Sequence, residues 1–145
     1  MPAHALADRI EGLVHADTQV HGAGVDLTVA EVARVAEAGR IDFGGGELAA
    51  ADLDPVETEL RSPDDDYGWW NLDTGGYVVR FNERLTGAEP VRVEPRRELA
   101  ARGGSLPTVT TADLDPLPLA VPTGTGDGPA LRVKENARIA TVRSV

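Results

Sequence analysis

The chain has 145 residues, a length typical of one domain, and 41% of them are hydrophobic, which excludes wholesale disorder. Its 24 acidic and 14 basic residues give a formal net charge of −10, so no nucleic-acid surface is expected, because phosphate backbones require clustered lysine and arginine. The absence of cysteine excludes disulfides and thiolate metal sites. No apolar run is long enough to cross a bilayer, and we expect a cytoplasmic protein without membrane contact.

The acidic composition has two compatible explanations. Lys134 is the single lysine among the basic residues. An acidic surface keeps a protein soluble at high salt, where the repulsion between its charges is screened. A GC-rich genome that encodes arginine in place of lysine also explains the composition, and both explanations stay open.

Hydrophobic periodicity predicts a short N-terminal helix followed by strands. Apolar residues recur at helical spacing within residues 3–14, whereas residues 20–29 alternate apolar and polar side chains, which indicates a strand. Residues 30–38 fit a helix by propensity or a continuation of that strand. Gly44-Gly45-Gly46 predicts a loop, and the acidic residues 47–67, with two prolines, predict a surface excursion.

The second half of the chain reads as short strands separated by turns. The clearest strand is Tyr77-Val78-Val79-Arg80-Phe81, after two glycines. Further strands are expected at residues 90–93, 109–114, 119–121 and 131–142, with an extended segment at 99–105 that breaks at its glycines, a turn region at 123–129 and a turn at Asn136. The sum is a single all-β domain over residues 1–145, a sandwich or barrel.

Four segments carry a family resemblance. The first covers residues 19–29, with Asp26-Leu27, and continues into Gly39-Arg40-Ile41-Asp42-Phe43. The second is residues 76–83, which end in Asn-Glu. The third, residues 102–116, joins a segment similar to Arg-x-Ser-Ser-Leu to a Thr-Ala-x-x-Asp-Pro hairpin, and the fourth is Asn136-Ala137-Arg138-Ile139-Ala140. In this order, over about residues 10–142, they resemble the archaeal-type dUTP diphosphatases of the dCTP deaminase/dUTPase family.

The resemblance implies a β-clip, dUTPase-like distorted barrel with a short N-terminal helix, assembled as a homotrimer with active sites between subunits. It implies an enzyme that binds a deoxyuridine nucleotide and hydrolyses dUTP to dUMP and pyrophosphate. The cofactor would be Mg²⁺, held through the substrate phosphates and not by direct protein ligands.

This chemistry needs a base for the attacking water and positive groups for the phosphates. By resemblance Asp115 is the base, with Asp113 as the fallback; the structural alternative is a turn aspartate before Pro116. Asp26 would support the site near the subunit junction, or lie on a strand surface. The substrate-binding residues implied by the resemblance are Arg102, Gly103, Gly104, Ser105, Thr111, Ala112, Lys134 and Arg138; the glycines and serine could equally form an ordinary turn, and Lys134 and Arg138 could be solvated strand charges.

The chain departs from the family pattern in three places. Residues 106–110 join the Ser-Leu and Thr-Ala pairs directly, where the family has a longer connection with a second arginine and a glycine. Leu117-Pro118-Leu119-Ala120 stands where the family has Gly-Tyr-x-Gly, which discriminates uracil and deoxyribose. Thr141 replaces a glutamine. These losses favour the alternative of a catalytically silent trimer that binds nucleotides or serves a structural or regulatory role.

Two further hypotheses concern the base of the nucleotide. dCTP deamination is disfavoured, because residues 129–133 carry no glutamate and Glu135 falls beyond them. Trp69-Trp70 could stack a base or belong to a core or interface. The three histidines have no metal-ligand spacing and are not expected to act in catalysis.

Overall fold

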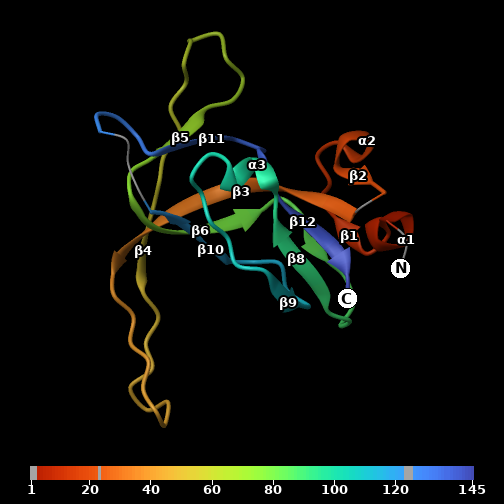
Figure 1. Ribbon diagram of the computed structural model, residues 1–145, viewed down its shortest axis with the longest axis horizontal. Coiled ribbons are helices and arrows are strands. Elements are labelled where there is room, and N and C mark those ends of the chain that lie inside the picture. The colour runs from red at the N-terminus through yellow and green to blue at the C-terminus, as the bar shows by residue number, and fades with distance from the viewer. Residues whose placement is uncertain (1–2, 23, 123–125) are drawn as a thin grey trace.

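The structure is a computed structural model that describes residues 3–22, 24–122 and 126–145, and it consists mainly of β-strands. In these residues the main sheet contains eight strands in the order β10-β6-β3-β12-β8-β9, with β2 and β4 paired to β3. The sheet curls into a half-barrel (Figure 1). Two smaller pairs, β1 with β7 and β5 with β11, complete the described strands. The predicted all-β fold with a short N-terminal helix is confirmed.

The elements, in chain order, are α1 Ala3–Ala7, β1 Ile10–Glu11, α2 Ala16–Gln19, β2 Val20–His21, β3 Gly24–Glu37, β4 Asp52–Pro55, β5 Trp69–Leu72, β6 Gly75–Phe81, β7 Arg84–Leu85, β8 Val91–Pro95, α3 Arg97–Ala100, β9 Val109–Thr111, β10 Leu117–Val121, β11 Leu131–Lys134 and β12 Arg138–Ser144.

Strand β3 lies at the centre of the main sheet. Its first half pairs with β12 and its second half with β6 and β4. Residues 24–29 are all buried, so both faces of the strand are covered here, although apolar and polar residues alternate in the sequence. The open choice at residues 30–38 is therefore settled: residues 30–37 continue the strand, because pairing on both sides outweighs a weak helical propensity.

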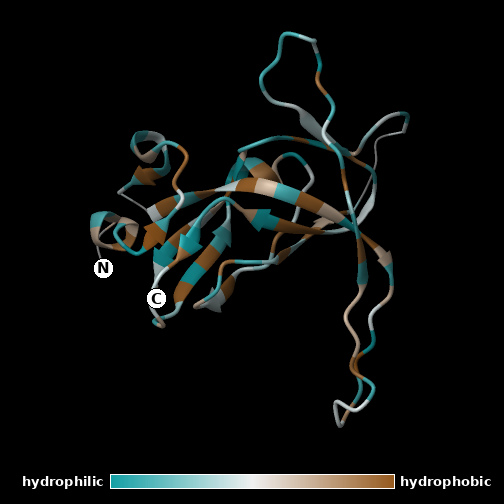
Figure 2. Cartoon of the chain, turned by 180° about the vertical axis from the view of Figure 1, so that it is seen from behind, coloured by the Kyte–Doolittle hydropathy of each residue, from teal (hydrophilic) through white to brown (hydrophobic). Residues whose placement is uncertain are grey.

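The core is built by the alternation of buried and exposed residues along the strands. Along β10, Leu117, Leu119 and Val121 are buried while the residues between them are exposed. The same alternation runs along β6 and β11. Figure 2 shows it as hydrophobic and hydrophilic bands that alternate along the strands.

Three sequence expectations are wrong in detail, one of them the strand expected at residues 109–114, which ends at Thr111. The N-terminal helix ends at Ala7, not near residue 14, and Gly12 has a φ of 87° where a Cβ would lie 2.5 Å from the Asn82 carbonyl oxygen. Residues 97–100 form the short helix α3, not an extended segment. The predicted turn at Asn136 is confirmed, with a φ of 65°. In the predicted turn at 123–129, residues 123–125 lie outside the described residues.

The chain between β3 and β4 projects from the sheet as an arm (Figure 1). Reciprocal backbone hydrogen bonds join Arg40 and Ala49, and the Asp42 carboxylate accepts from the amides of Gly45 and Glu47. Ile41 and Phe43 are fully or almost fully exposed on this arm. Over the described ranges, no helix is long and apolar enough to span a membrane.

Candidate active site

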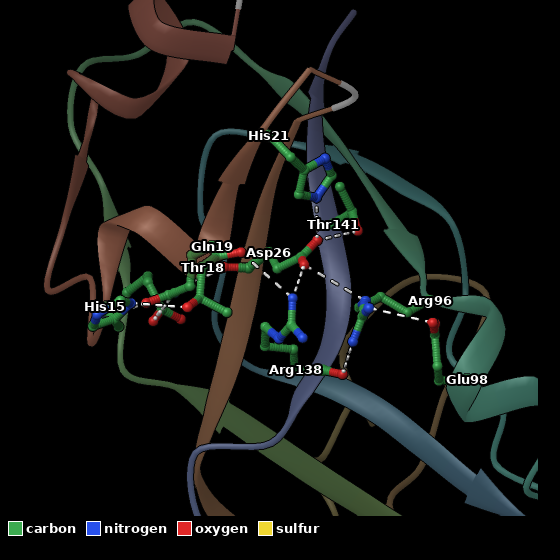
Figure 3. A network of polar contacts seen from close by, with 10 residues as sticks. His15, Thr18, Gln19, His21, Asp26, Arg96, Glu98, Arg138 and Thr141 are labelled. Atoms are coloured by element: carbon green, nitrogen blue, oxygen red, sulfur yellow. Dashed lines mark hydrogen bonds and ion pairs between the residues drawn. The ribbon is translucent and has the colours of Figure 1, made fainter.

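Asp26 is the centre of a buried polar cluster at the junction of β3 and β12. Its Oδ1 accepts from Thr141 Oγ1 at 2.7 Å and lies 2.9 Å from His21 Nε2. Its Oδ2 accepts from Arg138 Nη1 at 3.1 Å and lies 3.6 Å from Arg96 Nε. Figure 3 shows these side chains converging on the carboxylate, which is 1% exposed.

The cluster keeps Asp26 ionised. Burial opposes ionisation, but the hydrogen bonds from His21 and Thr141 and the charges of His21 and Arg96 outweigh it and hold the pKa of Asp26 below its ordinary value of 3.8. A carboxylate with a low pKa and both oxygens engaged is a poor general base. Asp26 is buried and not a surface strand residue, and its geometry suits the orientation of Arg138.

Arg96 was missed by sequence reasoning. It precedes α3, and besides contacting Asp26 it donates from Nη1 to the Arg138 carbonyl at 3.0 Å and lies 3.3 Å from Glu98. The available signal was a pair of arginines, Arg96 and Arg97, directly after the proline that ends β8. His21, for which no catalytic role was expected, contacts Asp26 in this cluster.

The structure brings together three of the residues predicted to bind substrate. Arg102, Lys134 and Arg138 line one hollow of about 200 Å³, together with Trp69 and Arg132. They come from the turn after α3, from β11 and from β12. The rest of the lining is one acid, Glu98, and five apolar residues, Leu99, Leu131, Val133, Ala137 and Ile139. A cationic hollow on an apolar base suits an anion that also carries an organic group.

The glycine loop is tied into the fold through its amides. The amides of Gly103 and Gly104 donate to Ala100 and Leu99, and the amide of Ser105 donates to Ala120. The amide of Arg102 also donates to Leu99. These amides are therefore engaged with carbonyl oxygens, and the Arg102 guanidinium and the Ser105 hydroxyl are the groups of this loop that suit a phosphate.

Asp115 occupies a half-buried position at the end of the turn that leads into β10. Its Oδ1 accepts from the Phe81 amide at 2.8 Å, and the Asp115–Pro116 peptide bond is cis. Burial raises the pKa of Asp115 above its ordinary value of 3.8, against the lowering effects of the Phe81 hydrogen bond and the Arg80 charge. A raised pKa brings a carboxylate closer to the range useful for a general base.

The residues before Asp115 shape this turn. Thr111 Oγ1 donates to the Asp113 carbonyl and accepts from the Asp113 amide, at 2.8 and 2.9 Å. Asp113 Oδ1 accepts from the Asp115 amide at 3.2 Å, whereas Ala112 is exposed. In the described part of the chain, no hydrogen bond or ion pair joins Asp115 to the residues of the cationic hollow.

The segment that stands where the family has its hairpin forms a strand of the main sheet. Leu117–Val121 form β10, an end strand of the main sheet order, paired to β6 on one side and bridged to Ser105 on the other. The Ala120 amide points toward Ser105 and away from β6, and by the two-residue repeat so does the nitrogen of Pro118. Pro118 therefore costs β10 no hydrogen bond to β6.

Across the ranges that the structure covers, no group of three or more His, Asp and Glu side chains is arranged to hold a metal ion. A magnesium ion bound through substrate phosphates does not require such a group.

Comparison with solved structures identifies the class of fold. The chain is similar to 2'-deoxycytidine 5'-triphosphate deaminase from Agrobacterium tumefaciens, with a TM-score of 0.57 and 17% identity over 99% of this chain and 45% of that one. The chain thus has the dUTPase-like fold of that deaminase. No protein-family model matches the chain.

Comparison with curated sequences gives the relationship. Over 101 residues, or 68% of this chain, it is 33% identical to a protein of Methanosarcina acetivorans and 31% identical to one of Methanosarcina mazei. Both are named "Probable deoxyuridine 5'-triphosphate nucleotidohydrolase". The chain is a homologue of these proteins, and the predicted resemblance to the archaeal-type branch of the dCTP deaminase/dUTPase family is confirmed. It spans about half of their length, 56%.

Proposed function

We propose that the chain is a dUTP diphosphatase that hydrolyses dUTP to dUMP and pyrophosphate. The observation that carries this proposal is the convergence of Arg102, Lys134 and Arg138 on one hollow. The names of the curated homologues support the same substrate. A nucleotide substrate also agrees with a location in the cytoplasm.

In this mechanism Asp115 accepts a proton from the water that attacks the α-phosphorus, and the P–O bond to the leaving pyrophosphate breaks. Arg102, Lys134 and Arg138 bind the phosphate oxygens, and Asp26 holds Arg138 in position. Ser105 and Thr111 are expected to lie near the substrate. Mg²⁺ bound to the phosphates would supply further neutralisation of their negative charge.

We further propose a homotrimer with the site between copies. Asp115 contacts β6, whereas the cationic hollow lies between α3, β11 and β12. A second copy that brings its Asp115 to this hollow would complete the site. The arm, with exposed Ile41 and Phe43, offers the kind of aromatic and aliphatic surface that assemblies cover.

The competing candidate is a catalytically silent trimer. It is favoured by β10, whose residues are held by β6 and Ser105 where the family has an aromatic ring and flexible glycines. Deamination has less support: Glu135 accepts from the Gly68 amide at 3.2 Å beyond the end of β11, and β11 itself contains no carboxylate.

The test is pyrophosphate release with Mg²⁺ from dUTP, dTTP, dCTP and UTP, at low and high salt. We expect release selective for dUTP, and we expect Asp115→Asn to lower kcat at least about 100-fold. The asparagine oxygen can still accept from the Phe81 amide, so the fold is preserved. Asp113→Asn is the matched control and should retain most activity. No release from a folded wild-type assembly would favour the silent protein, and full activity of Asp115→Asn would remove this residue from the mechanism.

A further inference from the structure

The two adjacent tryptophans have different environments. Trp70 is 4% exposed and belongs to the core, with its indole nitrogen donating to the Val56 carbonyl at 3.1 Å. Trp69 is only half-buried and lines two hollows. Trp70 thus fulfils the core role expected of a tryptophan pair, and the role of Trp69 stays open.

The second hollow, of about 590 Å³, is also lined by Trp69. Trp69 and Arg132 line both, so the two hollows adjoin each other. The remaining lining residues of the larger hollow are Glu59, Leu60, Arg61, Asn71 and Pro129.

Three cations around Trp69 lack a carboxylate partner. The Arg61 guanidinium carbon lies 4.1 Å from the centroid of the Trp69 ring, and Lys134 Nζ lies 5.6 Å from it. Within the residues that the structure describes, neither of these cations nor Arg132 has an acidic oxygen within ion-pair distance. The chain has 24 acids for 14 bases, so the pairing of these cations is limited by their placement and not by a shortage of carboxylates.

A planar group can take the place of Arg61 on the indole. Arginine stacks on tryptophan because its cation is attracted to the ring face, and nucleobases stack on the same face. Asn71 borders this position; its amide nitrogen donates to Glu59 at 2.7 Å, which fixes the side chain. Its amide oxygen has no hydrogen-bond partner among the described residues and can accept from a base N–H.

We propose that the base of a pyrimidine deoxynucleotide stacks on Trp69 in the larger hollow, with its phosphates in the smaller one. The inference rests on the proposed function and names a base-binding residue for it. The base displaces the Arg61 guanidinium, whose N–H groups turn to the phosphates. Trp69 then supplies the aromatic contact that β10, without a tyrosine and held in the sheet, does not offer.

The experiment compares the binding of dUMP, deoxyribose 5-phosphate and pyrophosphate to wild type and to Trp69→Leu by calorimetry. In wild type we expect dUMP to bind more tightly than deoxyribose 5-phosphate and to quench tryptophan fluorescence. In Trp69→Leu we expect dUMP binding to weaken about 10-fold or more, with pyrophosphate binding retained as the sign of an intact fold. Trp69→Phe should recover part of the affinity.

Tyr67→Leu is the matched control, because Tyr67 is an exposed aromatic two residues before Trp69 and lines neither hollow. Unchanged dUMP binding in Trp69→Leu, or wild type that binds neither dUMP nor pyrophosphate, overturns the proposal. Binding is measured without turnover, so a wild type that binds dUMP through Trp69 but releases no pyrophosphate from dUTP refutes hydrolysis alone. Turnover of dUTP with unchanged dUMP affinity in Trp69→Leu refutes the Trp69 site alone.

Discussion

Asp26 shows how a single buried charge links stability to pH. Its folded-state pKa is depressed below the ordinary value of 3.8, so the unfolded chain binds this proton more tightly than the folded one. The stabilisation from Asp26 is therefore complete well above pH 4 and is lost as the pH falls through the folded-state pKa.

We predict that Asp26→Asn lowers the free energy of unfolding by about 2–4 kcal/mol at pH 7, because Arg138 and Arg96 lose their buried partner. The deficit should be smaller at pH 3, where wild type has already lost part of this contribution. Urea unfolding at the two pH values measures it. Asp73→Asn is the control: this exposed carboxylate lies 4.0 Å from Arg34, and its removal should change little. Equal deficits of Asp26→Asn at both pH values would contradict the linkage.

Secondary structure could be predicted where one face of an element is buried. In β6 and β10 the alternation of apolar residues matches their burial, so residues 77–81 of β6 and 119–121 of β10 were identified from sequence. The helix α3 was missed because four residues are too few for a helical period. The contact of Arg96 with Asp26 joins residues far apart in the chain, and no local pattern contains it. The convergence of Arg102, Lys134 and Arg138 was expected only through the family resemblance.

In the glycine loop after α3, packing alone accounts for the glycine at position 104, without a role in phosphate binding. A Cβ on Gly104 would lie 2.4 Å from Leu99 Cδ1 and 3.2 Å from Leu131 Cδ2, so α3 and β11 approach each other over this glycine. The amide of Gly104 donates a hydrogen bond to the Leu99 carbonyl oxygen. Packing is therefore sufficient to require glycine at this position.

We predict that Gly104→Ala lowers the free energy of unfolding by about 1–3 kcal/mol through overpacking, as measured by urea titration. Gly46→Ala is the matched control, because a Cβ there meets no atom within 4 Å and its φ is not in the left-handed region. If both variants unfold at the same urea concentration, the loop yields to the added methyl group and the packing argument fails.

At the scale of the whole molecule, the two proposed halves of the active site are held by different parts of the fold. Asp115 depends on β6 for its hydrogen bond, and the cations depend on α3, β11 and β12. An arrangement in which one copy supplies the base and another supplies the cations makes activity a property of the assembly. The same feature makes the proposal testable with variants that are each inactive alone.

We predict complementation between Asp115→Asn and the double variant Arg102→Gln/Lys134→Gln. Each alone should release little pyrophosphate from dUTP. In a trimer co-assembled from equal amounts, a random arrangement places an intact base next to intact cations at about one interface in four, so about a quarter of wild-type activity should return. Different affinity tags on the two variants confirm that mixed assemblies have formed. If mixed assemblies form and stay inactive, base and cations act within one chain, because in that case no subunit of the mixture would hold a complete site.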